Sequence, residues 1–186
     1  MRHNLASPQQ RGLSLIELLV TLSIAVILLT IGVPSFVSFI TSNTATSYVN
    51  DMLADLNYAR TEAITRSLRV TVCHSTDSST CSTTGSWADG WIVFANINES
   101  GATGQDTRDG DDLVLRVHRA LSSGWTLTGA ADVVNYLAFQ PTGLSATAHN
   151  SGVGTFTLCK GAQVQTGNVI SLNQTGRVAV TNGTCL

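Results

Sequence analysis

The chain has 186 residues, a length that suits one domain with an attached segment. It carries 10 Lys and Arg against 12 Asp and Glu, a net charge of −2, and 12% of its residues are charged while 43% are hydrophobic. This composition excludes a disordered chain, which would be rich in charge and poor in apolar residues, and it argues against a basic nucleic-acid coat protein.

The first 12 residues, MRHNLASPQQRG, are polar, and Arg2 and Arg11 are the only full charges among them. After them, the segment 18–40 holds 23 residues without a charge. As a helix it would be about 34 Å long, enough to cross a hydrocarbon core of roughly 30 Å. A cleaved secretory signal has a shorter apolar core and a small-x-small site, so the segment predicts a membrane anchor. The basic residues before it predict a cytoplasmic N-terminus and export of everything after Ile40.

Glu17 is the only charge in the run from Leu13 to Ile40. A carboxylate inside a membrane-spanning helix costs about 2.5–3.5 kcal/mol, so such a residue usually has a partner or marks a function. It lies five residues after Gly12 in the string GLSLIELL, which resembles the class III signal of type IV pilins and type II secretion pseudopilins. The alternative is an acid that is merely tolerated near a membrane interface.

This resemblance implies a processing site and a role for Glu17. In the family a prepilin peptidase cuts after the glycine, here between Gly12 and Leu13, and methylates the new N-terminal residue, here Leu13. Glu17 is then expected to act in assembly, by neutralising the N-terminal amine of a neighbouring subunit in the filament. Leu13 stands where the family usually has Phe and Ser14 where it has Thr, and both changes are mild.

Gly32 and Pro34 strengthen the resemblance. A proline inside a helix removes one backbone hydrogen bond and crowds the carbonyl four residues back, here that of Thr30. Membrane helices tolerate this because neighbouring groups satisfy the backbone. At this distance from the cleavage site, type IV pilins bend or melt their long helix, so the resemblance implies a helix bend at Gly32 and Pro34.

Beyond Ile40 the helical pattern continues to about Ser67. Apolar residues recur at spacings of three, four and seven at Val49, Met52, Leu53, Leu56, Ala63 and Ile64, whereas Asp51, Asp55, Glu62 and Arg66 lie largely elsewhere. The pattern predicts one long helix from Leu13 to about Ser67, whose amphipathic half packs on the sheet of its own chain. The alternative is an apolar stripe that binds a partner.

From Leu68 onward the pattern changes to a period of two, with turn residues every 8–15 positions. It predicts a β-rich segment of about 119 residues (68–186) with eight strands. The expected strands are 68–73, 91–95, 113–117, 125–128, 133–139, 155–159, 169–172 and 177–180.

Three short motifs narrow the family. ARTEAI (59–64), GWIVF (90–94) and GRV (176–178) resemble, in the same order, landmarks of the GspH/FimT group. This group includes the type II secretion pseudopilin GspH and the minor pilins FimT and FimU. The resemblance implies an α+β type IV pilin fold, in which a long N-terminal helix packs on a β-rich head. The expected parts are a prepilin leader (1–12), a transmembrane assembly helix (13–40), the amphipathic half of that helix (41–67) and the head (68–186).

All four cysteines lie in the part that is expected to be exported, where oxidising conditions favour disulfides. Four cysteines permit three pairings. Sequence proximity and the cystine-closed C-terminus of the family favour Cys73–Cys81 and Cys159–Cys185. A metal site built from Cys73, His74 and Cys81 is the alternative, but it lacks a second ligand pair at zinc-like spacing.

The sequence contains no pattern typical of an enzyme. The histidines His3, His74, His118 and His149 include no pair at i, i+4, and there is no Gly-x-Ser-x-Gly motif. The acidic stretch 106–112 does not have the spacing of an EF-hand loop, so a solvated loop is expected there. We therefore expect no catalytic site, no cofactor and no metal.

DNA binding has one candidate site. Some FimT-type minor pilins are associated with a C-terminal Gly-Arg-x-Arg element that contacts DNA, but here Gly176-Arg177 is followed by Val178-Ala179, so the second arginine is absent. Without the leader, eight basic residues face twelve acidic ones, a net charge of −4. Arg177 and Lys160 are expected to form at most a small basic spot near the cystine; the alternative is a turn glycine followed by an exposed strand arginine.

The resemblance implies a FimT/FimU-like minor pilin that acts in the assembly and priming of a type IV pilus. A GspH-type pseudopilin of type II secretion is the first alternative, and a DNA-binding minor pilin for natural transformation is the second. The implied partners are other pilin or pseudopilin subunits, the prepilin peptidase, the inner-membrane assembly platform and, in the last hypothesis, DNA. The chain is expected in the inner membrane as a single-pass protein with a periplasmic C-terminus, and then in the filament.

Overall fold

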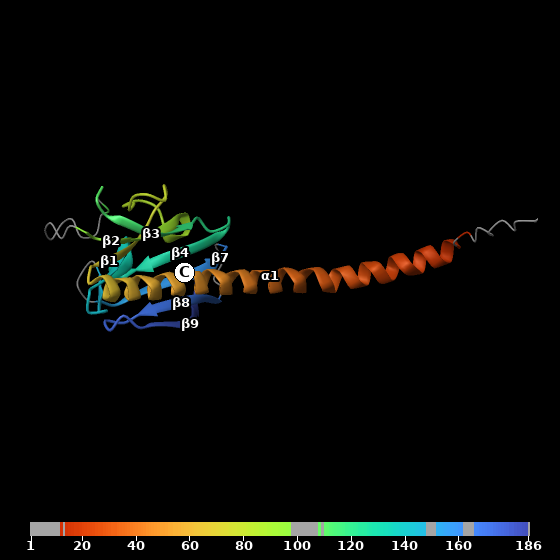
Figure 1. Ribbon diagram of the computed structural model, residues 1–186. Helices are drawn as coiled ribbons and strands as arrows, with labels where there is room; N and C mark the ends of the chain where they lie inside the picture. The colour runs from red at the N-terminus through yellow and green to blue at the C-terminus, as the bar shows by residue number, and fades with distance from the viewer. Residues whose placement is uncertain are drawn as a thin grey trace, which may run out of the picture. The chain divides into compact units, whose positions relative to one another are not determined.

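The computed structural model of the chain describes residues 12, 14–97, 108, 110–147, 152–161 and 166–185. These residues form one long helix, α1 (Leu15–Arg66), followed by two antiparallel sheets (Figure 1). The chain divides into two compact units, 1–42 and 43–186. The first unit holds the N-terminal part of α1, and the second holds the rest of α1 with every described strand. The expected α+β fold, a long helix with a β-rich head, is therefore confirmed.

Local chemistry explains where α1 begins and ends. The backbone N–H of Glu17 lies 3.3 Å from Ser14 Oγ and 3.1 Å from Ser14 O, so Ser14 caps the first turn. The acid Glu17 in the first turn and the base Arg66 in the last both suit the helix dipole. Ser67 adopts a left-handed conformation with φ 53°, which ends the helix. The expected range Leu13–Ser67 is thus nearly met, although Leu13 lies outside the described residues.

Two sheets make up most of the second unit. The first has the strand order β3-β2-β1-β5-β6 and the second has the order β4-β7-β8-β9, and all neighbouring strands are antiparallel. The strands are β1 (Val70–His74), β2 (Gly90–Ala95), β3 (Leu113–Arg119), β4 (Trp125–Ala130), β5 (Tyr136–Phe139), β6 (Ser145–Ala146), β7 (Gly154–Lys160), β8 (Thr166–Leu172) and β9 (Val178–Thr184). Two short 3-10 helices, η1 (Trp87–Asp89) and η2 (Ala131–Val133), precede β2 and β5.

All eight expected strands are present, with bounds that differ from the expected ones by up to four residues. The expected strand 133–139 is wrong at its start, because Val133 ends η2 and β5 begins only at Tyr136. The buried indole of Trp87 explains the difference, since its Nε1 donates to the carbonyls of Val133 and Val134, each at 3.0 Å. Strand β6 was not expected, because two residues are too few to form an alternating pattern.

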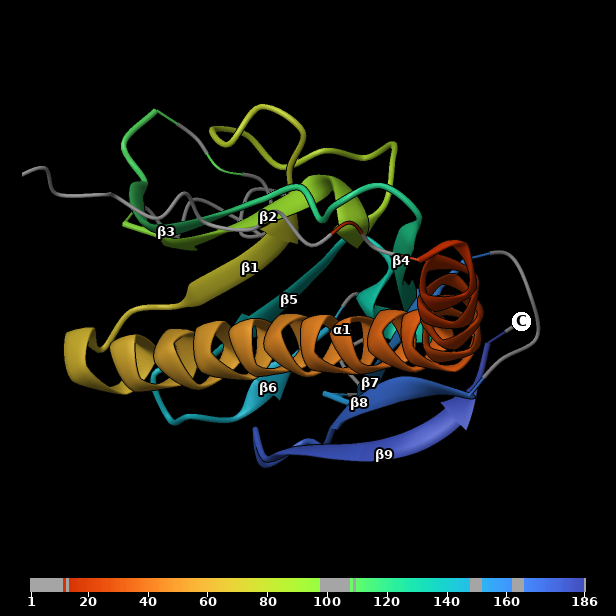
Figure 2. The same cartoon turned by 90° about the vertical axis from the view of Figure 1, so that its right-hand side faces the viewer.

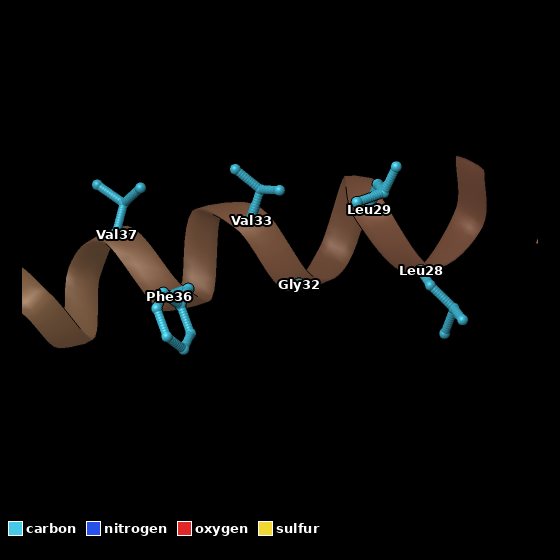
Figure 3. Close-up of a pocket in the computed structure, with 6 residues that line it drawn as sticks. All are labelled: Leu28, Leu29, Gly32, Val33, Phe36 and Val37. Carbon is cyan, nitrogen blue, oxygen red and sulfur yellow. The ribbon is translucent and has the colours of Figure 1, made fainter. Parts of the chain in front are cut away.

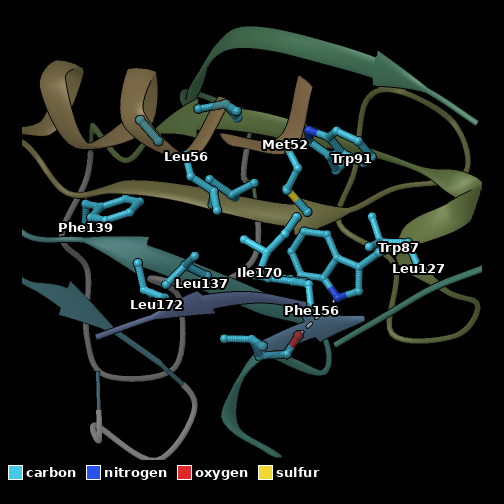
Figure 4. Close-up of a cluster of buried hydrophobic side chains, with 14 of the residues drawn as sticks. Met52, Leu56, Trp87, Trp91, Leu127, Leu137, Phe139, Phe156, Ile170 and Leu172 are labelled. Carbon is cyan, nitrogen blue, oxygen red and sulfur yellow. Dashed lines mark hydrogen bonds between the residues drawn. The ribbon is translucent and has the colours of Figure 1, made fainter. Parts of the chain in front are cut away.

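The hydrophobic core of the second unit lies between α1 and both sheets. Figure 2 shows the later part of α1 running in front of strands of both sheets, and Figure 4 shows how their buried side chains meet. The helix contributes Val49, Met52, Leu56, Ala59 and Ala63, and the sheets contribute Val70, Val72, Trp91, Val93, Leu127, Leu137, Phe139, Phe156, Leu158, Ile170 and Leu172. The amphipathic stripe of α1 therefore packs on its own domain.

The edge of this stripe differs from the prediction. Ile64, which we expected to be buried, is 50% exposed, and Leu53 is only half-buried. Ala63, which we predicted, and Ala59, which we did not, are the buried residues of these last turns, because the stripe continues from Val49 at alternating spacings of three and four.

Asp55 is the larger departure from the sequence pattern. We expected it on the polar side of α1, but it is buried, with 7% of its surface exposed. Its carboxylate accepts a hydrogen bond from Trp91 Nε1 on β2 at 2.8 Å and one from Arg116 Nη1 on β3 at 2.9 Å. A buried carboxylate is stable only when it is paired and hydrogen-bonded, and both conditions are met here. Asp55 therefore ties the helix to two strands of the first sheet.

Aromatic stacking surrounds this carboxylate. The guanidinium of Arg116 lies 3.9 Å from the centroid of the Tyr58 ring, a cation–π contact. The imidazole of His118 stacks on Trp91 with 3.8 Å between centroids and 2° between planes, and its Nε2 lies 3.6 Å from Asp51 Oδ2. We call Asp55, Trp91 and Arg116 the Asp55 cluster.

We predict that Asp55→Ala lowers the free energy of unfolding by about 2–3 kcal/mol, because it leaves the Trp91 indole N–H and the Arg116 guanidinium without their acceptor. Asp51→Ala is the matched control on the same helix, and its more exposed pair with His118 should contribute less than about 1 kcal/mol. Urea unfolding of the full chain in detergent micelles, followed by tryptophan fluorescence, measures both. Equal losses in the two variants would contradict the role of Asp55.

Candidate functional site

The N-terminal part of α1 exposes an apolar surface on all sides. Its large apolar side chains between Leu15 and Ile40 are each 50–80% exposed. An 18-residue window of α1 has a mean hydropathy of 2.5, and none of that window is buried by the described parts of the chain. By length and composition α1 is suited to cross a membrane.

Four hydroxyl groups within this segment are satisfied by the helix itself. Each donates to a carbonyl three or four residues back, at 2.8–2.9 Å, so it needs no water in an apolar environment. The pairs are Thr21 with Leu18, Ser23 with Leu19, Thr30 with Ile27, and Ser38 with Ser35.

Glu17 is the exception on this surface. It lies exposed in the first turn of α1, next to the cap Ser14, and no described cation is within ion-pair distance of its carboxylate. The predicted cleavage site adjoins it: Gly12 is exposed, while Leu13 and the leader residues 1–11 lie outside the described residues. A lone carboxylate on an apolar helix has to find its counter-charge elsewhere.

Gly32 and Pro34 lie near the middle of the apolar segment. The helix continues through Pro34 without a break, so the bend at this point stays a prediction. A Cβ atom added at Gly32 would meet nothing within 4 Å, which leaves a notch in the helix surface. A shallow apolar groove surrounds it (Figure 3), lined by Leu28, Leu29, Gly32, Val33, Phe36 and Val37.

The first disulfide, Cys73–Cys81, covers the outer face of the first sheet. Ile92 and Phe94 are fully buried beneath it, and Tyr136 packs against the same cluster. The bond leaves no thiolate for the alternative metal site, and no group of three or more His, Cys, Asp or Glu among the described residues is placed to hold a metal.

Asp77 organises the loop that this disulfide closes. Its carboxylate accepts from the backbone N–H of Thr80 at 2.7 Å and of Ser79 at 2.8 Å, and from the hydroxyls of Thr80 and Ser75. These hydrogen bonds, above all the one from the Thr80 backbone, hold the pKa of the Asp77 carboxyl well below its usual value.

The second disulfide, Cys159–Cys185, joins β7 to the end of β9 across the intervening strand β8. It passes over Gly167, where a Cβ atom would lie 2.6 Å from Cys185 Sγ, 3.0 Å from Cys159 Sγ and 2.6 Å from the Leu158 carbonyl oxygen. Only a glycine leaves room for the bond. The two disulfides are the pairs that the resemblance implied, whereas no sequence pattern indicated the role of Gly167.

We predict that Gly167→Ala prevents closure of Cys159–Cys185 in most molecules, because the backbone oxygen of Leu158 cannot move aside cheaply. Gly110→Ala is the control, since a Cβ atom there meets nothing within 4 Å. Thiol alkylation and non-reducing peptide mapping should recover free thiols at Cys159 and Cys185 only in the first variant, with Cys73–Cys81 intact in both. A fully oxidised Gly167→Ala chain would contradict the packing argument.

The candidate basic residue Lys160 has its charge engaged within the fold. Its Nζ donates to the carbonyl of Ser123 at 3.2 Å and lies 5.1 Å from the centroid of the Trp125 ring. It lies at the end of β7 that carries Cys159.

Arg177 lies at the other end of the same sheet, so the expected basic spot is not formed. In the strand register, Leu172 pairs with both Gly154 at the start of β7 and Val178, the neighbour of Arg177. Lys160 is six residues further along β7, about 20 Å away at 3.3 Å per residue. The prediction failed because it placed both residues near the cystine without knowing the strand register.

The three sequence motifs supply residues that pack the elements of the fold together. Arg60 of ARTEAI donates from Nε to the carbonyl of Gly143 at 3.1 Å. A Cβ atom at Gly176 of the GRV motif would lie 2.9 Å from Arg60 Nε. The side chain of Arg60 therefore contacts both the turn that contains Gly143 and the turn that contains Gly176. Trp91 of GWIVF binds Asp55. The sequence analysis assigned no role to Arg60 or Asp55. Arg60 lies within the ARTEAI motif and Asp55 lies four residues before it, and this position was the available signal.

Comparisons with known proteins agree on one family. The profile described as "Type II transport protein GspH" matches residues 48–180, and the profile described as "Prokaryotic N-terminal methylation motif" matches residues 7–33. No curated protein matches the chain.

Two crystal structures of the type IV minor pilin FimU from Pseudomonas aeruginosa are similar to the chain. One has a TM-score of 0.56 at 21% identity and covers 77% of this chain and 92% of FimU. The other, in a second crystal form, has a TM-score of 0.52 at 22% identity and covers 73% and 91%. At these identities the likeness shows a shared fold.

Proposed function

The chain belongs to the family of the type II transport protein GspH, whose members are pilin-like structural subunits, and from this premise we propose that residues 13–186 form a minor pilin of a type IV pilus. The observation that carries the proposal is Glu17, a lone carboxylate in the first turn of an exposed apolar helix, five residues after Gly12.

Processing creates the counter-charge that Glu17 lacks. The prepilin peptidase cuts between Gly12 and Leu13 and methylates Leu13, whose amine remains a cation. Each mature subunit then carries one cation and one carboxylate within five residues. Because an unpaired carboxylate in an apolar environment costs about 2.5–3.5 kcal/mol, pairing Glu17 with the Leu13 amine of the adjoining subunit favours joining the filament.

The apolar surface of α1 explains why assembly is needed to leave the membrane. Exposing a large apolar side chain to water costs about 1.5–3 kcal/mol, and many such side chains lie between Leu15 and Ile40. A single subunit therefore stays in the inner membrane. Extraction by the assembly platform becomes feasible when the helices of neighbouring subunits cover one another in the filament.

Charge and disulfide chemistry support the proposed topology. Arg2 and Arg11 precede the apolar segment and favour a cytoplasmic N-terminus, so that the second unit lies in the periplasm before assembly. Two disulfides in that unit suit an oxidising compartment.

A pseudopilin of type II secretion is the alternative function. The match of the GspH profile to residues 48–180 favours it, whereas the two disulfides and the FimU-like fold favour the pilus. Deletion of the gene discriminates between them, through loss of secreted proteins or loss of pili. We do not extend the proposal to DNA uptake, because Lys160 and Arg177 lie at opposite ends of their sheet.

The first test is mass spectrometry of pili sheared from the native cells, with enrichment for scarce subunits. We expect a chain that begins at methylated Leu13 in that fraction. Processed chain in the inner membrane alone would favour the pseudopilin. An uncut chain that still carries residues 1–12 would overturn the whole proposal.

We predict that Glu17→Gln leaves membrane insertion intact and lowers the amount of the chain in the filament by at least about tenfold, the effect of 1.4 kcal/mol. The isosteric amide removes the charge while keeping the shape. Glu62→Gln is the matched control, because Glu62 pairs with Arg66 on the same helix outside the apolar segment. Immunoblots of membrane and sheared-pilus fractions measure both variants, and unchanged incorporation of Glu17→Gln would exclude the charge-pairing step.

A further inference from the structure

The last strand, β9, is attached to the fold in an unusual way. It is the open edge of the second sheet and pairs with β8 through all seven of its residues, from Val178 to Thr184. Its side chains, however, bury little: Val178 and Gly183 are half-buried and the other five are exposed. Its neighbour β8 buries Ile170 and Leu172 in the core. Backbone hydrogen bonds rather than side-chain burial therefore hold β9.

The turn that leads into β9 is anchored independently of the strand. Ser145 of β6 donates from its hydroxyl to the Asn173 carbonyl at 2.8 Å, and its backbone N–H donates to the Gln174 carbonyl at 3.2 Å. Arg60 of α1 packs against Gly176 in the same turn. The chain is thus fixed to the first sheet and to the helix directly before β9 begins.

The far end of β9 is fixed by one covalent bond. Cys185 follows the last residue of the strand and is bonded to Cys159 of β7, across Gly167 of β8. Cys159 is 8% exposed and Cys185 is 5% exposed, so the bond is shielded while the strand is in place. Strand β9 is therefore held by the anchored turn at its start, by a disulfide at its end and by backbone hydrogen bonds to β8 between them.

We propose that β9 is a detachable strap: opening the Cys159–Cys185 disulfide releases residues 178–185 and uncovers the edge of β8, while the rest of the second unit stays folded. A dithiol performs the opening. It passes two electrons and two protons to Cys159 and Cys185, the S–S bond breaks to give two thiols, and the dithiol becomes a disulfide. The other disulfide, Cys73–Cys81, lies on the outer face of the first sheet and does not contact β9.

Hydrogen–deuterium exchange of the full chain in detergent micelles tests the strap. The variant Cys159→Ser/Cys185→Ser should exchange the amides of 178–184 at least ten times faster than the unmodified chain, with β1, β2 and β7 unchanged. Cys73→Ser/Cys81→Ser is the matched control, and it should raise exchange in the loop 75–86 without affecting 178–184. Dithiothreitol added to the folded, unmodified chain should reproduce the fast exchange of 178–184, which makes the test independent of how the variants fold.

Two results would overturn the proposal. Slow exchange of 178–184 after opening of the bond would mean that the backbone ladder alone holds the strand. Release of β9 also frees the β8 amides that bond to it, but fast exchange that spreads to β7 and to the β8 amides that bond to β7 would mean that β9 is an integral part of the sheet rather than a strap.

Discussion

Both sheets depend on one stripe of α1, the buried positions from Val49 to Ala63. The inner faces of the two sheets meet this stripe in a single cluster of buried side chains, so the helix completes the main core of both sheets. Apolar packing alone is tolerant of small shifts between a helix and a sheet. Asp55 fixes the position of the helix on the first sheet, because its carboxylate has both hydrogen bonds only where Trp91 and Arg116 reach it together.

The part of α1 before residue 40 also has apolar side chains that need to be covered. There the apolar side chains point in all directions and no described residue covers them. In the proposed function this surface lies first in lipid and then against other subunits. Among the described residues, Glu17 is the single charge on that surface, and no described cation lies within ion-pair distance of it. In the proposed function this residue carries the electrostatic part of assembly. One continuous helix, α1, provides both the buried stripe of the second unit and the exposed apolar surface before residue 40, and this accounts for its length.

The sequence predicted most of the fold because its signals are local. The change of period from helical to alternating indicated α1 and eight strands. The spacing from Gly12 to Glu17 indicated a pilin-like chain, and three short motifs narrowed it to the GspH/FimT group. Asp55 was missed because a charged residue next to an apolar stripe normally faces water, and only the tertiary fold brings Trp91 and Arg116 to it. Gly167 and the separation of Lys160 from Arg177 depend on strand register, which joins residues distant in the chain and leaves no mark in a local pattern.

The stripe on α1 also has a mechanical consequence. The buried positions from Val49 to Ala63 span fifteen residues, about 21 Å from first to last along the helix axis. A pull along that axis loads the apolar contacts and the Asp55 hydrogen bonds in shear, all at once, whereas a pull at right angles would peel them one turn at a time. In the proposed filament, a subunit pulled along its helix is thus loaded in shear across all of these contacts together.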